Sequence, residues 1–313
     1  MILCVTLNPC LDKTLSVPAW RPGDLVRGRS SRDVVGGKGN NVARALKRLG
    51  RDPRPVTFLG GTVGETCRTL LKEADGLEPI AVATAAPTRV ILTVATEGTA
   101  DQTAFFDPDP AVTHAEADEL VAKVETALAE PGVEALTLSG SSPSTTTHGV
   151  YSDLISLAGA RRVPVFLDTY GPALEAIWGF WPTVLQMNRR EAGMRLGKPA
   201  GDDDVADLLR SWRRRGVALG VVTDGPAPAF FLAGDVLYRA FPPEIHVKNP
   251  IGSGDSLLAG LVDARLKGLD PEATIRRAMA CAVANASVWD AGAVDPETVE
   301  RLEHEIEVEV EAP

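Results

Sequence analysis

Positive charge is scarce in this chain of 313 residues: 32 lysines and arginines stand against 42 aspartates and glutamates, and the formal net charge is -10. The longest basic run is the three arginines of 213–215. Since nucleic acids and anionic membrane surfaces bind clustered cations, we expect neither as a partner. Apolar runs are short as well. None approaches the ~20 residues that span a bilayer, so we expect no membrane-spanning helix.

Cysteine and histidine are also rare, with four of each. The cysteines are Cys4, Cys10, Cys67 and Cys281. Because they form no Cys-x-x-Cys pair and the histidines lie far apart, neither a zinc site nor a disulfide scaffold is indicated. The opening apolar run, 1–7, meets Asn8-Pro9 without a basic segment before it, which predicts a strand rather than a signal peptide. We therefore expect a cytoplasmic protein with reduced, buried thiols.

Short apolar runs alternate along the chain with stretches of helical period. The runs typical of buried strands are 2–7, 56–59, 135–138, 163–167 and 217–222. The helical stretches are 42–49, 117–129, 150–157, 205–214 and 257–266. This alternation predicts an α/β fold, in which a mostly parallel sheet carries helices on both faces in three α/β/α layers. The alternating residues 306–311 predict one further, half-exposed edge strand.

Two segments, 14–35 and 88–106, interrupt this alternation with β-branched and aromatic residues that alternate with polar ones. We expect them to form a small antiparallel sheet inserted into the core. With their connections they would span 12–35 and 86–108 and make a lid over the carboxyl edge of the large sheet. The whole chain, 1–313, would then be a single domain with an inserted lid.

The first motif with chemical meaning is Gly36-Gly37-Lys38-Gly39-Asn40-Asn41, directly before a predicted helix. Glycines at a helix start let an anion approach the free backbone N–H groups, and the helix dipole attracts it. Lys38 would add a cation and Asn41 a hydrogen-bonding amide. Taken alone, the motif is equally consistent with an ordinary loop before a helix.

The second motif is Asn249-Pro250-Ile251-Gly252-Ser253-Gly254-Asp255, before another apolar helix. The backbone N–H groups of 252–254 would form a concave nest suited to a transferring phosphoryl group. Asp255 would lie at its mouth, where a kinase needs a carboxylate that accepts the proton of the substrate hydroxyl. The alternative is an ordinary acidic residue in the first turn of a helix.

Together the two motifs resemble the paired signatures of the PfkB, or ribokinase-like, family of carbohydrate kinases. The first continues with Val42-Ala43 and the second with Ala259-Gly260-Leu261-Val262, as in that family. Thr6-Leu7-Asn8-Pro9 followed by Asp12 is similar, more narrowly, to the branch of 1-phosphofructokinase and tagatose-6-phosphate kinase. The resemblance covers essentially the whole chain. It implies a ribokinase-like fold with a β-sheet lid, ATP and Mg²⁺ as cofactors, and a homodimer joined through the lid.

The resemblance also implies roles for individual residues. The base would be Asp255, with an anion hole made by Gly252, Ser253 and Gly254. The substrate would contact Asp12, Gly37, Lys38, Asn41, Arg89 and Ser139, with Lys38 and Arg89 on its phosphate. The nucleotide would contact Asn188, Thr223 and Gly225, and Glu191 would order Mg²⁺ and its waters.

The chain departs from the family pattern at three places. Gln186-Met187 stands where the branch has Lys-Pro, so a cation near the ATP phosphates is missing. The stretch 103–110 differs from the usual lid strand, and Pro226 constrains the nucleotide turn. These departures put nucleotide use and the shape of the substrate pocket in question.

We therefore expect ATP-dependent phosphorylation of a ketohexose monophosphate, such as fructose 1-phosphate, tagatose 6-phosphate or fructose 6-phosphate, to a bisphosphate. The sequence leaves open which sugar phosphate and which carbon react. One alternative is a kinase of an unphosphorylated sugar or nucleoside, for which Arg89 would be dispensable. Another is a non-catalytic sugar-phosphate sensor of the same fold, which the loss of the Lys-Pro pair favours. A nicotinamide oxidoreductase is disfavoured, because no glycine-rich turn follows the first strand.

Overall fold

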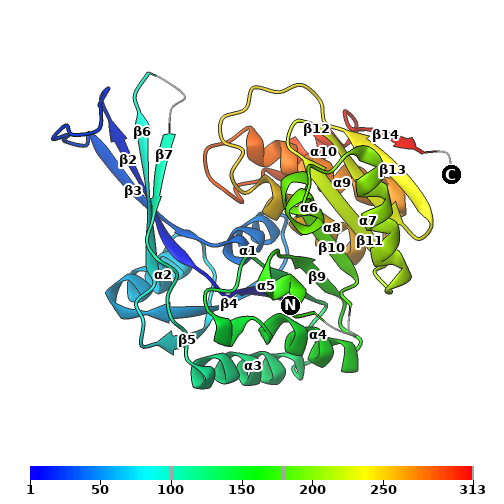
Figure 1. Ribbon diagram of the computed structural model, residues 1–313, viewed down its shortest axis with the longest axis horizontal. Coiled ribbons are helices and arrows are strands. Elements are labelled where there is room, and N and C mark those ends of the chain that lie inside the picture. Colours follow the sequence, from blue (N-terminus) through cyan, green and yellow to red (C-terminus); the bar gives the residue numbers. More distant parts are fainter. Residues whose placement is uncertain (99–101, 178–180, 312–313) are drawn as a thin grey trace.

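The computed structural model describes residues 1–98, 102–177 and 181–311. Within these residues a large sheet has ten strands in the order β14-β13-β12-β11-β10-β9-β8-β1-β4-β5 (Figure 1). Their bounds are β1 Ile2–Thr6, β4 Pro53–Gly60, β5 Ile80–Thr84, β8 Ala135–Ser139, β9 Val165–Asp168, β10 Val184–Asn188, β11 Leu219–Asp224, β12 Ala227–Ala233, β13 Val236–Phe241 and β14 Glu307–Val310. Seven neighbouring strands of this sheet are parallel: β5, β4, β1, β8, β9, β10 and β11. Strands β12, β13 and β14 continue the sheet in antiparallel pairs.

Helices follow most of the parallel strands, and three more come between β13 and β14. The helices of the described residues are α1 Lys38–Arg48, α2 Gly61–Glu73, α3 His114–Leu128, α4 Val150–Ala160, α5 Pro172–Glu175, α6 Arg189–Leu196, α7 Asp202–Arg214, α8 Ser253–Lys267, α9 Pro271–Ala286 and α10 Pro296–Glu303, with a 3₁₀ turn at Thr145–Thr147. Each strand and helix predicted from the sequence is present, with ends that differ by a few residues. The α/β architecture with a mostly parallel sheet is thereby confirmed.

Strand β1 shows why the sheet is covered on both faces. Leu3 and Val5 belong to one apolar core and Ile2 and Cys4 to the other, because successive side chains of a strand point to opposite faces. Buried residues of α3, α4 and α7 line the first core. Those of α1, α2, α8, α9 and α10 line the second. The predicted three-layer arrangement follows directly.

The strand order reverses at β1, which lies between β4 on one side and β8 on the other. In an open parallel sheet, ligands bind at such a reversal, beyond the carboxyl ends of the strands. Polar residues stand at those ends: Asn8 follows β1, and Ser139, Asp168 and Asn188 end β8, β9 and β10. Helices α1 and α8 both begin at this edge and pack against each other. The sheet therefore gathers the predicted motifs in one region.

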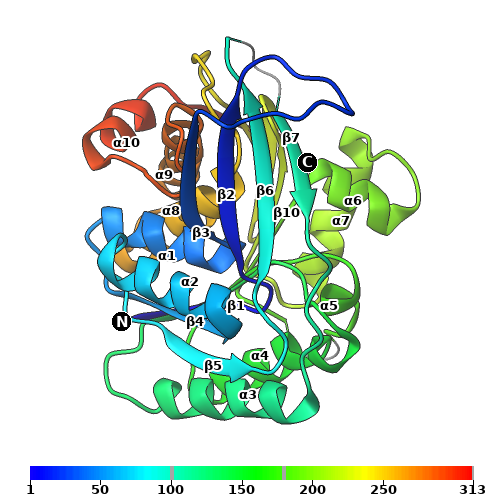
Figure 2. The ribbon, with the colours of Figure 1, turned by 90° about the vertical axis from the view of Figure 1, so that its left-hand side faces the viewer.

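The second sheet has the order β3-β2-β6-β7 and projects from the body (Figures 1 and 2). Its strands are β2 Cys10–Val17, β3 Ser30–Gly36, β6 Arg89–Thr96 and β7 Gln102–Phe106. They fall in the two predicted lid segments, except that β2 begins two residues before and β3 ends one residue after the predicted 12–35. Residues 99–101 of the second segment lie outside the described part. The two outer pairs are antiparallel as expected, but the central β2–β6 pair is parallel. Both central strands start at the body and run outward, so they share a direction.

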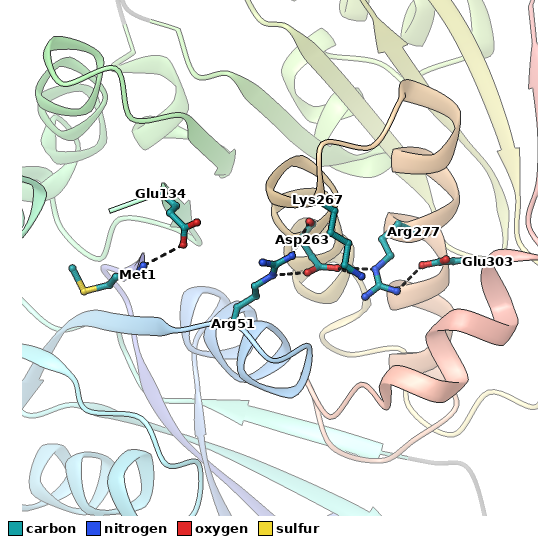
Figure 3. A network of polar contacts seen from close by, with 7 residues as sticks. All are labelled: Met1, Arg51, Glu134, Asp263, Lys267, Arg277 and Glu303. Carbon is teal, nitrogen blue, oxygen red and sulfur yellow. Dashed lines mark hydrogen bonds and ion pairs between the residues drawn. The ribbon is translucent and has the colours of Figure 1, made fainter. Parts of the chain in front are cut away.

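A network of ion pairs connects helices of the second core at their end away from the carboxyl edge of the large sheet (Figure 3). Asp263 of α8 accepts hydrogen bonds from Arg51, at 2.7 Å, and from Arg277 of α9, at 2.8 Å. Arg277 also donates to Glu303 of α10, at 2.6 Å. The carboxylate of Asp263 is fully buried, and the positive charges of its partners compensate the cost of that burial.

In the described residues, no helix is long and apolar enough to cross a membrane.

Candidate active site

Lys38 opens helix α1 and lies close to two carboxylates, one at the end of β9 and one in the first turn of α6. Its Nζ lies 2.9 Å from Oδ1 of Asp168 and 3.7 Å from Oε1 of Glu191. Burial lowers the pKa of Lys38, but the charges of Asp168, Asp255 and Glu191 outweigh it and raise that pKa. The ammonium group is therefore charged at neutral pH. Tyr170 adds a ring whose centroid lies 5.6 Å from Nζ.

The turn before Lys38 needs glycine at position 37. Gly37 has a φ of +107°, and a Cβ there would come within 2.7 Å of Cγ2 of Thr6. A larger residue would push the start of α1 away from β1. Gly37 therefore brings the backbone of α1 close to the carboxyl end of β1, where Lys38 and Asn41 enter the site.

Asp255, in the first turn of α8, is a second buried carboxylate near Lys38: 5% of its surface is exposed, against 2% for Asp168. Its Oδ2 accepts a hydrogen bond from Nδ2 of Asn41 at 2.8 Å. Burial raises the pKa of Asp255 to about 7; Asp168 and Glu191 act in the same direction, while Lys38 and Asn41 oppose it. A pKa near the working pH is the property that a general base requires.

The glycines before α8 are fixed by packing. Gly252 has a φ of +85°, and a Cβ there would lie 2.6 Å from Cβ of Ala291. In the described structure no side chain caps the start of α8; the N–H of Ser253 donates to the carbonyl of Pro250 at 3.2 Å, and the next N–H groups of the first turn have no side-chain acceptor. Asn285, fully buried in α9, donates to the carbonyl of Ile251 at 2.9 Å and to Oγ of Ser253 at 3.3 Å. This amide fixes the loop that the sequence predicts to be an anion nest.

Gln186 of β10 lies against the same loop. Its Nε2 donates to the carbonyl of Gly254 at 2.8 Å, whereas its buried Oε1 has no hydrogen-bond partner among the described residues. The residue that replaces the family's lysine therefore supports the glycine loop by a neutral hydrogen bond. It adds no charge next to the loop.

Asp12 and Arg89 lie at the base of the lid, on β2 and β6. Arg89 donates to Oδ1 of Asp109 at 2.8 Å and to the carbonyl of Asn8 at 3.3 Å. Burial raises the pKa of Asp12, and the nearby guanidinium of Arg89 opposes that shift. Asn8 also donates to Asp109, at 2.9 Å. These residues form a second polar group, separate from the contacts of Lys38.

The remaining predicted residues stand at strand ends. Ser139 is fully buried at the end of β8, and its Oγ has no partner in the described part of the chain. Asn188 and Glu191 cap α6 reciprocally, with both hydrogen bonds at 2.9 Å. Thr223 is the partner of Asn188 in the β10–β11 register, and Gly225, with a φ of +56°, makes the turn after β11. The positions predicted to bind the nucleotide thus lie at the ends of two adjacent strands.

Sequence reasoning missed three residues that complete these groups, Asp168, Asp109 and Asn285. Asp168 directly follows a predicted strand run, which is a signal that could have identified it. Asp109 lies in the unusual stretch 103–110, but nothing in that stretch pointed to Arg89. Asn285 sits in unremarkable sequence, and only the fold brings it to the glycine loop. No contact joins Lys38 with Arg89 among the described residues. The proposed meeting of both on one phosphate stays a prediction.

The polar groups fit a magnesium nucleotide in part. Among residues 1–98, 102–177 and 181–311, no group of three or more His, Cys, Asp and Glu side chains could hold a metal ion alone. The donor set near α6 is instead the carboxylates of Asp168 and Glu191, which suits an ion that keeps most of its waters and binds phosphate oxygens, as Mg²⁺ does. The uncapped start of α8 suits the phosphates themselves.

Comparison with solved structures agrees with this architecture. A "possible 1-phosphofructokinase" from Thermotoga maritima superposes with a TM-score of 0.88 at 24% identity, over 100% of both chains. Phosphofructokinase-2 from Escherichia coli, in complex with fructose 6-phosphate, gives 0.85 at 24% identity, over 97% of this chain and 98% of that one. A carbohydrate kinase from Agrobacterium tumefaciens gives 0.77 at 23%, over 99% of each chain.

The sequence itself carries the family signature. The model of the pfkB family of carbohydrate kinases matches residues 5–298. This range contains both glycine motifs, the lid and the chain from the end of β1 to the start of α10. The chain therefore belongs to the pfkB family of carbohydrate kinases and is a phosphotransferase that acts on an alcohol group.

Proposed function

We propose that the chain transfers the γ-phosphoryl group of ATP to a free hydroxyl of a ketohexose monophosphate and yields a bisphosphate. The observation that carries this proposal is the burial of Asp255 beside Lys38, at the uncapped start of α8. A base, a cation and backbone N–H groups are what phosphoryl transfer to an alcohol demands.

In the proposed reaction the sugar hydroxyl oxygen attacks the γ-phosphorus as the bond to the ADP oxygen breaks. Asp255 accepts the hydroxyl proton, so that the alkoxide charge does not build up. The N–H groups of 252–254 stabilise charge on the transferring phosphoryl oxygens. Lys38 lies on the side of Asp168 and Glu191, where it would balance negative charge next to the base. Bound Mg²⁺, held through Glu191 and water, would neutralise phosphate charge; Asn188, Thr223 and Gly225 would hold the nucleotide.

The residues where the lid joins the body favour a substrate that already carries a phosphate. Arg89 is mostly buried, and its Nη1 is held by Asp109, a side chain that is 45% exposed. A substrate phosphate offers stronger bidentate acceptors and could replace that exposed carboxylate. Asp12 would bind sugar hydroxyls, and Gly37, Asn41 and Ser139 would line the remaining pocket. The E. coli structure that contains fructose 6-phosphate shares this fold and supports the same substrate class.

The test is ADP release with Mg²⁺ and ATP in the presence of fructose 1-phosphate, fructose 6-phosphate or tagatose 6-phosphate. Fructose, ribose, a nucleoside and a blank without sugar are the controls. Turnover with a sugar phosphate alone is the expected result. Turnover with only an unphosphorylated sugar or nucleoside would overturn the substrate class. A rise in melting temperature with a sugar phosphate, without turnover, would favour a sensor instead.

We also propose a homodimer joined through the lid. The lid strand β7 is exposed along its whole length, and Phe105 and Phe106 are 52% and 64% exposed. Large apolar side chains exposed together on a strand are typical of a surface that another protein chain covers. A structure of E. coli phosphofructokinase-2 is described as a tetramer, which supports self-association in this family.

We propose a cytoplasmic location as well, which the four free, buried cysteines support.

A further inference from the structure

The amide of Asn41 is held from both ends. Its Nδ2 donates to Oδ2 of Asp255 at 2.8 Å, and its Oδ1 accepts from Nη1 of Arg44 at 3.0 Å. A guanidinium carries only donors, so it can bind the oxygen end of the amide but not the nitrogen end. Arg44 therefore decides which way Asn41 faces, and the nitrogen is turned toward the carboxylate.

Arg44 is itself fixed by a full set of acceptors. It is 6% exposed, and its Nε and Nη2 donate to the two carboxylate oxygens of Asp75 at 2.9 and 2.8 Å. Nη1 donates to the carbonyl of Ala291 at 2.9 Å, and Nη2 to the carbonyl of Val35 at 3.0 Å. Such a planar fork, bound on every side, cannot rotate away from Asn41 without losing several hydrogen bonds.

The same guanidinium touches the parts of the molecule that must act together. Val35 belongs to lid strand β3, and Ala291 packs against Gly252 at the start of α8. The neighbouring Gly292 lies directly on α1, where a Cβ would come within 2.6 Å of the carbonyl oxygen of Asn41. Arg44 thus joins the lid base, helix α1 and the segment behind the anion nest.

We propose that Arg44 is a positioning residue that acts through Asn41 on the base Asp255. This inference rests on the proposed function, because it takes Asp255 as the base. With Arg44 in place, the amide donates to the carboxylate and stabilises its charged form. Without it, the amide is free to rotate, and its oxygen can face the carboxylate and repel the charge.

The other charged groups around Asp255 come from separate elements. Lys38 reaches it from α1, Asp168 from β9 and Glu191 from α6. None of them contacts Arg44, whose ion-pair partner is Asp75, after α2. A substitution of Arg44 therefore leaves these charges in place and changes the orientation of Asn41.

The test compares Arg44→Lys with a matched control, Arg277→Lys. Arg277 is 4% exposed and pairs with two acidic residues, Asp263 and Glu303, at the far end of the helices (Figure 3). Lysine keeps the charge at both sites, but its single nitrogen cannot bond both carboxylate oxygens of Asp75 and Oδ1 of Asn41 as the three nitrogens of the fork do, so Asn41 loses its fixed donor. Both variants are expected to lower the melting temperature, but only Arg44→Lys should change the site.

The diagnostic readout is the pH midpoint of the acid limb of kcat for ATP and the sugar phosphate that the wild-type protein uses. Arg44→Lys should move this midpoint upward by about one pH unit, since a hydrogen bond to a charged group has that magnitude. Activity should therefore recover at higher pH, with KM for the sugar phosphate little changed. In an Asn41→Ala background, Arg44→Lys should cause no additional shift.

An unshifted midpoint, or equal shifts in Arg44→Lys and Arg277→Lys, would overturn the proposal while the proposed kinase function stands. The same midpoint can be measured without turnover, from the pH dependence of the difference in unfolding free energy between each protein and its Asp255→Asn variant. A wild-type chain without kinase activity would refute the proposed function, and this second measurement would still decide the role of Arg44.

Discussion

Lys38 and Asp168 form an ion pair of 2.9 Å directly beside the buried Asp255. The pair joins the start of α1 to the end of β9, and it sets the field in which Asp255 titrates. Asp168 raises the pKa of Asp255 and Lys38 lowers it, so the two partners act in opposite directions. Their separate contributions can be measured.

Removal of the Asp168 charge should make Asp255 more acidic. In Asp168→Asn, Lys38 loses its nearest partner and Asp255 loses a neighbouring negative charge, so the acid limb of kcat/KM should move to lower pH. A pH profile from about 5 to 9 measures this. The exposed Asp207→Asn is the control and should leave the midpoint unchanged. A shift to higher pH in Asp168→Asn would contradict the assignment.

Loss of the base should abolish most turnover. Asp255→Asn keeps the shape and can still bond to Asn41, but it cannot accept a proton, so kcat should fall by ~10²- to 10⁴-fold. The dissociation constant of the sugar phosphate, measured by calorimetry, should stay within a few-fold of the wild-type value. A variant with near-full turnover would refute the role of Asp255.

The raised pKa of Asp255 also predicts a stability effect with a definite sign. The native carboxyl titrates at about 7 and the unfolded one near 3.8, so between these values the native state holds an extra proton. Stability therefore falls as pH rises through that window, by up to roughly 1.4 kcal/mol per pH unit. Asp255→Asn should be more stable than wild type at pH 8 and lose this advantage toward pH 4. Equal pH dependence in both proteins would argue against the shift.

Arg89 and Asp109 should affect a phosphorylated substrate in opposite ways. Arg89→Met should raise KM for the sugar phosphate by about 10- to 100-fold, because one charged hydrogen-bond donor is lost. Asp109→Asn should lower KM, since the competing carboxylate charge is removed. Lys13→Met, which breaks an ion pair with Asp33 on the same lid, is the control. If Arg89→Met leaves KM unchanged, the substrate does not bring a phosphate to this site.

The proposed dimer can be tested on the two lid phenylalanines. Phe105 and Phe106 point to opposite faces of the sheet, so single substitutions by glutamate identify the face that is covered. One of the two variants should sediment as a monomer while the wild type sediments as a dimer. Val236→Glu, also on an exposed strand, should keep the wild-type mass. A monomeric wild-type protein would refute the dimer.

The parts that sequence predicted well have local signals. The apolar run of β1 and the glycines before α1 and α8 carry their own conformational requirements, so the fold and the place of Asp255 could be predicted. Arg44 and Asn285 carry no such signal, because their roles come from partners such as Ala291 and Ser253, distant in the chain. The parallel pairing of β2 with β6 was missed for the same reason, since pairing depends on where two separate segments leave the body.

That parallel pairing fixes the spacing between two proposed substrate contacts. Arg89 is the register partner of Cys10, and Asp12 lies two residues further along β2, on the same face of the sheet. A tilt of the whole lid leaves the distance between Arg89, proposed to bind the phosphate, and Asp12, proposed to bind sugar hydroxyls, unchanged. The lid would then select sugars by the distance between their phosphate and their hydroxyls before any bond is broken.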